Sequence, residues 1–460
     1  MSINAKLGDI LRAVTRTGAD FADMYFEIAA SHSYAFEDGS FEEISSSSSE
    51  GVGARILLGE ATSLAYAPGV ALETGASCLH EAAEHSGLSL PCRRMPAIRV
   101  MEREPPFPTP EYAFFYDLDK RIKASSMWIR QVSMNLDTAF KSFSVFNSDG
   151  SIAGDRRLYT IFSVEVVVEK NGILQTGYES EAFSVDSGEF FRTVSPFKVA
   201  QRALSRALLM LDAPQCPAGA MTVLLSGEAG GTMIHEACGH GFEADIIQKD
   251  YSVYRDKIGK QAASSLITLV DDGSIPGYLG SGSFDDEGTP CKRNVLIEKG
   301  VVRSYISDIA SSRRGALPLT GNGRRSSYRS VPQPRMTNTY IEPGDSSPVE
   351  MLHSMNRGLL VKKMGGGEVD PTSGDFVFHV TEGYLVEGGR VLHPVRGAVL
   401  TGNGPDVLMN IEAVGNDLHF LPGMCGKSGQ SVPVTDGQPS LLVGNLTVGG
   451  ANTCDDAIFE

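Results

Sequence analysis

The spacing of hydrophobic and polar positions changes along the first part of the chain. Apolar residues from Ile3 to Arg16 recur at the three- and four-residue intervals of an amphipathic helix. The segment from Ala22 to Ala67 alternates apolar and polar positions, which predicts strands broken at Asp38-Gly39 and Leu58-Gly59. The composition of Ser45 to Ser49 is typical of a linker, but its strand-like flanks favour an edge strand or a loop.

A proline-rich stretch and a second set of strands follow. "EREPPFPTPEY", residues 102–112, carries four prolines and predicts a link between domains, with Thr109-Pro110 opening a helix that runs to about Met127. Residues 158–183 predict two strands joined at Asn171-Gly172, a preferred hairpin turn. Residues 195–211 then have a Ser-Pro start and the spacing of an amphipathic helix.

These patterns predict three domains in an α+β protein. Residues 1–104 form a helix-plus-hairpins domain, and residues 105–213 form a central domain of β-hairpins and helices. Both are expected to be small and to contain antiparallel sheet. Residues 214–460 form a larger, β-rich carboxy-terminal domain that contains a helix with His235.

Composition and charge exclude several classes of protein. The 460 residues are 42% hydrophobic and 21% charged, as expected for a globular protein. A net charge of -16 argues against a nucleic-acid surface, which needs clustered basic residues. No apolar run is long enough for a membrane span, and the amino terminus lacks the apolar core of a signal peptide. Seven scattered cysteines favour reduced thiols, so we expect a cytoplasmic protein without membrane contact.

The candidate chemistry centres on "MIHEACGHGFEAD", where His235-Glu236 is followed by His240. Metal-binding histidines in H-E-x-x-H lie four residues apart on one helical face, whereas these lie five apart. On a regular helix they would point about 140° apart. A π-bulge between Glu236 and Gly239, eased by the glycine, would bring both rings to one side. Alternatively, the pair is a chance occurrence with a buried, hydrogen-bonded histidine.

Three separated blocks resemble the TldD/PmbA family of metalloproteases. They are "LLSGEAGGTMIHEACGHGFEAD", "GNGRRSSYRSVPQPRMTNTYIEPGD" and "MCGKSGQSVPVTDGQPSLLVGNLTVGG", in the family's order. The resemblance implies that His235, His240 and Cys425 hold Zn²⁺, with the fourth position left for water. It also implies that Glu236 is the catalytic general base, and that this chain is the TldD-type subunit, because the PmbA-type (TldE) subunit lacks the H-E-x-x-x-H motif.

Two further cysteines and a glycine-rich block also contain candidate site residues. Cys238 lies between the two histidines but is expected to pack as a small buried hydrophobe. Cys454 lies near the chain end, beyond the last family block, and is a weaker candidate ligand than Cys425. The block with Arg324 and Arg325 lacks the order of a phosphate-binding loop, so we interpret it as an irregular loop near the active site whose arginines and amides hold a peptide.

The resemblance also implies a dimer that encloses the active site in a channel and cleaves small or unfolded peptides. The partner would be a second copy or a PmbA/TldE-type subunit. Two alternatives remain: a non-catalytic, zinc-containing partner or modulator protein, and a hydrolase of another amide. A glutamate base beside an open metal site disfavours the first, because a structural zinc normally has four protein ligands.

Overall fold

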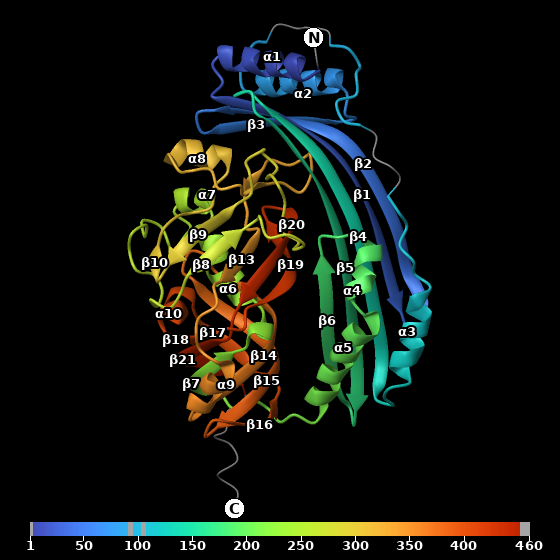
Figure 1. The fold of residues 1–460 in the computed structure, drawn as a ribbon, viewed down its shortest axis with the longest axis vertical. Helices are drawn as coiled ribbons and strands as arrows, with labels where there is room; N and C mark the ends of the chain where they lie inside the picture. The colour runs from blue at the N-terminus through green and yellow to red at the C-terminus, as the bar shows by residue number, and fades with distance from the viewer. Residues whose placement is uncertain (1–2, 91–94, 103–106, 451–460) are drawn as a thin grey trace, which may run out of the picture.

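The computed structural model describes residues 3–90, 95–102 and 107–450, which form two lobes (Figure 1). The amino-terminal lobe ends with the long helix that precedes residue 212. Its elements are α1 (Ile3–Arg16), β1 (Phe21–Glu37), β2 (Ser40–Leu58), β3 (Ala61–Pro68), α2 (Leu72–His85), α3 (Phe114–Lys123), β4 (Ile129–Asn147), β5 (Ile152–Lys170), β6 (Ile173–Phe183), α4 (Ser187–Thr193) and α5 (Pro196–Leu211).

One antiparallel sheet dominates the amino-terminal lobe. Its strand order is β3-β2-β1-β4-β5-β6, so strands from segments 1–104 and 105–213 pair directly through β1 and β4. Alternate residues of β1, such as Met24 and Phe26, pack into a core with α1 and α2. Further along the same face, Tyr34 and Phe36 join a second core with α3 and α5. The opposite face of the sheet, which carries Asp23 and Arg55, contacts the carboxy-terminal lobe.

The predicted hairpins of this lobe are confirmed. Asp38-Gly39 and Asn171-Gly172 both adopt positive φ angles and join β1 to β2 and β5 to β6. Ser45 to Ser49 lie inside β2, where they pair only with β1, because β3 begins to pair with β2 at Gly51. The serine run is therefore part of an edge, as its flanks indicate.

The helix predicted from Pro110 to about Met127 is shorter than expected: α3 begins at Phe114 and ends at Lys123. The preceding residues instead follow the sheet, where Phe107 stacks on His32 and Tyr112 stacks on Tyr34. These aromatic contacts hold the chain against β1 and delay the start of the helix. Residues 103–106 of the predicted link lie outside the described residues.

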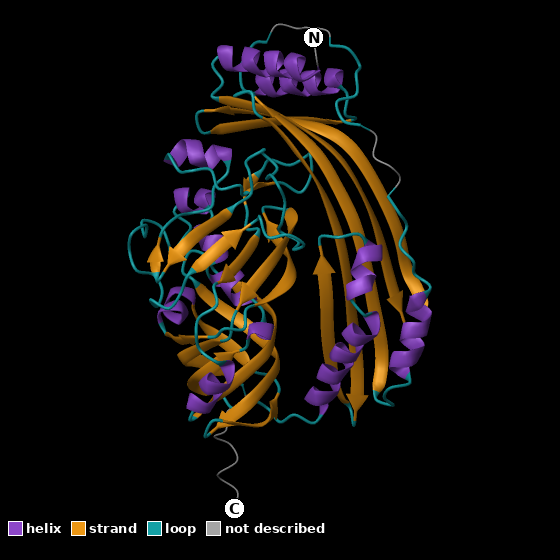
Figure 2. Ribbon diagram, viewed as in Figure 1, coloured by secondary structure: helices purple, strands orange, loops and turns teal. Residues whose placement is uncertain are grey.

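The carboxy-terminal lobe is built mainly from short strands and loops (Figure 2). Its elements are β7 (Gly219–Leu225), η1 (Gly227–Ala229), α6 (Thr232–Ala237), η2 (Gly239–Phe242), α7 (Ala244–Gln248), β8 (Leu269–Asp272), β9 (Arg293–Glu298), β10 (Val301–Val302), α8 (Ile309–Gly315), β11 (Gly323–Arg324), β12 (Gln333–Pro334), β13 (Asn338–Ile341), α9 (Pro348–Ser354), β14 (Arg357–Val369), β15 (Asp375–Glu387), β16 (Arg390–Val395), β17 (Val399–Asn403), α10 (Gly404–Met409), β18 (Ile411–Val414), β19 (His419–Lys427), β20 (Gln430–Gln438) and β21 (Leu441–Gly449).

Two sheets of this lobe enclose the short helix α6. One has the order β10-β9-β8-β13-β20-β19, which leaves β19 at its edge. The other has the order β14-β7-β21-β17-β15-β16, and an additional pairing of β14 with β15 closes it into a ring. Helix α6 packs against β13 and β20 of the first sheet and against β14 of the second. The predicted α+β class with antiparallel sheets is confirmed.

Buried charged groups join the two lobes. Arg55 on β2 pairs with Asp23 of its own sheet and, at 2.6 Å, with Glu287 of the carboxy-terminal lobe. Arg157 on β5 pairs with Asp286 at 3.1 Å. All five side chains are less than 8% exposed, so the lobes meet through ion pairs that solvent does not screen. Among the described residues, no helix is long and apolar enough to cross a bilayer.

Candidate metal centre

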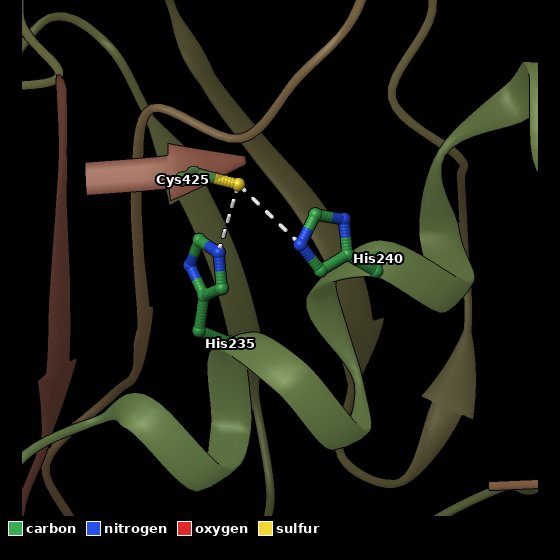
Figure 3. Close-up of side chains that lie close together, drawn as sticks. All are labelled: His235, His240 and Cys425. Atoms are coloured by element: carbon green, nitrogen blue, oxygen red, sulfur yellow. Dashed lines mark hydrogen bonds between the residues drawn. The ribbon is translucent and has the colours of Figure 1, made fainter. Parts of the chain in front are cut away.

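The structure brings His235, His240 and Cys425 together (Figure 3). His235 lies on α6, His240 on η2, and Cys425 on the edge strand β19. The Sγ atom of Cys425 is 3.2 Å from Nε2 of His235 and 3.4 Å from Nε2 of His240. The two rings stand perpendicular, with centroids 5.1 Å apart. Segments nearly 190 residues apart thus place three potential metal ligands at one point.

The backbone between the histidines differs from the expected π-bulge. Helix α6 ends at Ala237, Cys238 leaves the helical region with φ -121°, and the 3₁₀-helix η2 begins at Gly239. The amide of Cys238 donates to the carbonyl of Ile234, an ordinary i to i-4 bond, so this turn is not widened. The prediction of a bulge is therefore wrong. A helix break turns the chain and brings His240 back toward His235.

Gly239 is required by packing at this break. A Cβ atom at residue 239 would lie 1.9 Å from Sδ of Met336, which is fully buried. The φ angle of Gly239 is not positive. The absence of a side chain at residue 239 therefore allows close packing against Met336. It does not ease a helical bulge, as its position in the sequence had indicated.

Each histidine is oriented by a buried carboxylate. Nδ1 of His235 lies 2.6 Å from Oδ1 of Asp436, and Nδ1 of His240 lies 3.1 Å from Oε2 of Glu243. Such partners fix the ring and direct the other nitrogen toward a metal. Sequence analysis missed both residues. Two signals in the sequence were available: Glu243 follows His240 by three positions, and Asp436 lies in the same block as Cys425.

The cluster is strongly polarised. Burial opposes the charged form of both imidazoles, but Asp436 raises the pKa of His235 well above its ordinary value, and Glu243 raises the pKa of His240 to about 10. Burial also raises the pKa of the Cys425 thiol, yet hydrogen bonds from both histidines outweigh it and lower that pKa to about 5. A divalent cation would replace the protons between the imidazoles and the thiolate.

The geometry and chemistry of these donors fit zinc. In a tetrahedral site with Zn–N of about 2.0–2.1 Å and Zn–S of about 2.3 Å, nitrogen and sulfur ligands lie about 3.5 Å apart. The observed separations of 3.2 and 3.4 Å are close to this value. Imidazole and thiolate together suit a borderline-soft ion, and three protein ligands leave one position open.

Glu236 lies beside the cluster without joining it. Its side chain is 32% exposed, and Oε2 is 3.9 Å from Nε2 of His240. A carboxylate next to the ligands, but free to contact solvent, has the placement that a general base requires. Cys238 is fully buried, and Tyr254 donates a weak bond to its Sγ. It packs in the core away from the cluster, whereas Cys454 lies outside the described residues.

The arginine-rich block supports the strands that carry the site. Both terminal nitrogens of Arg324 donate to main-chain carbonyls, those of Met336 and Pro433, at 2.6 Å. Arg335 donates to the carbonyl of Cys425. Arg324 and Arg325 are both less than 5% exposed. Both arginines nevertheless line a cavity that Met424 and Pro433 also border, so the expectation that they hold a peptide stays a prediction.

Three potential metal ligands with a carboxylate beside them are typical of metal-dependent hydrolases. Comparison with known sequences agrees with this class. Residues 218–450 match the PmbA/TldA metallopeptidase C-terminal domain, residues 111–211 match the central domain, and residues 22–86 match domain 1. The chain therefore belongs to the PmbA/TldD metallopeptidase family.

Individual relatives cover nearly the whole chain. A "Metalloprotease TldD homolog" of Haemophilus influenzae is 36% identical over 96% of both chains. A metalloprotease of Methanocaldococcus jannaschii is 32% identical over 91% of this chain and 94% of its own. A "Zinc metalloprotease TldD homolog" of Saccharolobus solfataricus is 32% identical over 66% of both chains.

Solved structures share the fold. TldE from Thermococcus kodakarensis superposes with a TM-score of 0.75 at 18% identity, covering 96% of this chain and 99% of its own. A putative modulator of DNA gyrase from Thermotoga maritima gives a TM-score of 0.74 at 21% identity, covering 97% of this chain and all of its own.

Proposed function

We propose that this protein is a zinc-dependent metallopeptidase of the TldD type. His235, His240 and Cys425 hold the metal, and Glu236 is the general base. The observation that carries this proposal is the convergence of two Nε2 atoms and one Sγ atom, each histidine being oriented by its own carboxylate. Membership of a metallopeptidase family, and relatives that are named metalloproteases, support it.

The residues divide the catalytic work between them. Bound zinc supplies a Lewis acid for the scissile carbonyl and makes water more acidic. Glu236 accepts a proton from the attacking water and returns it to the leaving amine. Asp436 and Glu243 keep the Nδ1 atoms of the histidines occupied, so that both Nε2 atoms remain directed at Cys425.

The proposed substrates are small or unfolded peptides. A cavity of about 270 Å³ lies between the long sheet and the hairpin of β19 and β20, with Ser31 and Ser47 on one side and Met424 and Pro433 on the other. A space of this size admits part of an extended chain, not a folded domain. Met424 is next to Cys425 in sequence but projects from the opposite face of β19, and none of the proposed metal ligands is among the residues lining this cavity.

The proposed assembly is a dimer that encloses the site, with a second copy or a PmbA/TldE-type subunit as the partner. The shared fold with TldE supports such a partnership. We also propose that the protein is cytoplasmic, which five free cysteines among the described residues support. A metal-containing modulator without activity is the alternative. The partly exposed Glu236 beside an open ligand set favours the enzyme.

Metal analysis tests the proposed ligands. The wild type is expected to contain about one zinc ion per chain, and His235→Ala and Cys425→Ser are each expected to lose most of it, because two ligands do not hold zinc tightly. Full zinc occupancy in both variants would refute this ligand set.

Substitution of the base separates an enzyme from a modulator. Glu236→Gln should retain zinc and fold but lose about 10²- to 10⁴-fold in the rate of peptide cleavage. Cleavage of an unfolded peptide library by the wild type and the variant, with and without a PmbA-type partner, would be followed by mass spectrometry. Equal rates would reject Glu236 as the base, and an inactive, zinc-loaded wild type with its partner present would favour the modulator.

A further inference from the structure

Lys427 links the strand that carries Cys425 to the segment that carries His240. Its Nζ atom is 2.9 Å from Oε2 of Glu243, 2.7 Å from Oδ1 of Asp245 and 3.2 Å from the carbonyl oxygen of Pro334. A lysine ammonium has three hydrogens to donate, and these three acceptors use them all. Lys427 is 10% exposed at its side chain and Glu243 is fully buried.

These contacts close a ring around the metal centre. Lys427 follows Cys425 by two positions on β19, so both side chains project from the same face of the strand. From Lys427 the ring runs to Glu243, from Glu243 to Nδ1 of His240, and from Nε2 of His240 to Sγ of Cys425. Cys425 and His240 are thus connected twice: directly, by the contact between Sγ and Nε2, and indirectly, through the ion pair between Lys427 and Glu243.

The surroundings of Glu243 make it depend on Lys427. Among the described residues, its Oε1 atom has no hydrogen-bond partner, and Oε2 serves both His240 and Lys427. A buried carboxylate needs a cationic partner to remain charged. The lysine therefore holds the carboxylate that in turn holds the ring of His240.

We propose that Lys427 is a positioning residue of the metal centre, which sets the separation of His240 and Cys425 through Glu243. The inference rests on the proposed metal site. A role in binding substrate does not fit, because the ammonium group is nearly buried and has no hydrogen left to donate. Lys427 also donates to the carbonyl oxygen of Pro334, in the arginine-rich block. The next residue of that block, Arg335, donates to the carbonyl oxygen of Cys425.

The test is the metal affinity of Lys427→Met, which keeps the length of the side chain and removes its charge. The full chain would be stripped of metal, and Zn²⁺ affinity measured by competition with a chromophoric chelator. Co²⁺ absorption would report the geometry of the thiolate and imidazole ligands independently of activity. Loss of an outer partner of a metal ligand typically weakens affinity 10- to 100-fold, and we expect a loss of this size together with an altered Co²⁺ spectrum.

Two further variants make the result specific. Lys363→Met is the matched control, because Lys363 forms a similarly enclosed pair with Glu179, at 3.2 Å and 16% exposed, away from the metal centre. It should bind Zn²⁺ as the wild type does. Lys427→Met leaves the carboxylates of Glu243 and Asp245 without their lysine. If that variant does not fold, the double variant Lys427→Met/Asp245→Asn removes one of these two charges, and its Zn²⁺ affinity is measured in the same way.

The outcomes separate this inference from the proposed function. Weak Zn²⁺ binding in the Lys427 variants, with normal binding in Lys363→Met, supports the positioning role. Wild-type affinity and an unchanged Co²⁺ spectrum in the Lys427 variants would overturn it and leave the metal site intact. Failure of the wild type to bind Zn²⁺ would overturn the metal site, and this inference with it. If Lys363→Met weakens Zn²⁺ binding as much as Lys427→Met does, the loss reflects general destabilisation of the protein, and the positioning role is overturned as well.

Discussion

Gly239→Ala is predicted to destabilise the protein, although helix propensity alone predicts the opposite. Alanine is favoured over glycine in helical segments by about 1 kcal/mol. At residue 239, however, the new Cβ would lie 1.9 Å from Sδ and 2.9 Å from Cε of Met336. Ordinary contacts between such atoms are about 3.5–4.0 Å. The sulfur overlap is therefore about 2 Å, so either the end of the Met336 side chain or the backbone at residue 239 must move.

The surroundings limit how this overlap can be resolved. Met336 is fully buried in the main core of the carboxy-terminal lobe, and Arg324 binds its carbonyl oxygen. Overpacking of such a site typically costs about 1–3 kcal/mol. If η2 moves instead, His240 moves with it, and the 3.4 Å separation from Cys425 is lost. We therefore expect lower stability together with at least tenfold weaker metal binding.

A double-mutant cycle tests this reasoning. Urea unfolding of the metal-free protein and Zn²⁺ competition would be measured for Gly239→Ala, Met336→Ala and the double variant. Met336→Ala alone should cost about 2–5 kcal/mol because it leaves a cavity. In the double variant the new methyl group occupies part of that space, so the total loss should be smaller than the sum. Additive losses, or a Gly239→Ala variant as stable as the wild type, would refute the steric explanation.

The remaining predictions concern the carboxylates. Asp286→Asn should destabilise the protein by about 3–5 kcal/mol at pH 7, because the buried Arg157 would lose its closer carboxylate and keep only the longer contact with Asp155. Burial raises the pKa of Asp286, but neighbouring cations hold it well below the usual range, so its stabilisation is present above about pH 4 and is lost as the pH falls toward the folded-state pKa. Urea unfolding should show the difference from wild type shrinking below about pH 4, whereas Asp212→Asn, in an exposed pair, should cost less than about 1 kcal/mol at any pH. Asp436→Asn should weaken Zn²⁺ binding about 10- to 100-fold by loosening His235, and unchanged affinity would show that the carboxylate does not orient the ring.

Hydrophobic spacing and turn residues in the sequence predicted the helices and turns that depend mainly on neighbouring residues. The amphipathic spacing of Ile3–Arg16 coincides with α1, and Asn171-Gly172 forms the turn between β5 and β6. The start of α3 was predicted too early, because contacts of Phe107 and Tyr112 with β1 are not encoded in local spacing. Strand pairing between β1 and β4 is likewise a property of the assembled sheet.

The same division applies to the metal centre. The cluster of His235, His240 and Cys425 was expected from resemblance to a family, whereas the five-residue spacing left the two histidines ambiguous. The helix break between them depends on how Gly239 meets Met336, a contact across almost 100 residues. Partners such as Lys427 could not be found by spacing, because they act between segments that only the folded chain brings together.

The charged junction between the lobes has a mechanical consequence. Moving the long sheet away from the carboxy-terminal lobe would separate Arg55 from Glu287 and Arg157 from Asp286 and would break these buried ion pairs, although Arg55 would keep Asp23 and Arg157 would keep Asp155 of the same sheet. The buried ion pairs of this junction therefore oppose a hinge motion that would separate the two lobes. In a peptidase that keeps this junction closed, the space already present between the long sheet and the β19–β20 hairpin would select the substrate, so that an extended chain would enter where a folded one would not.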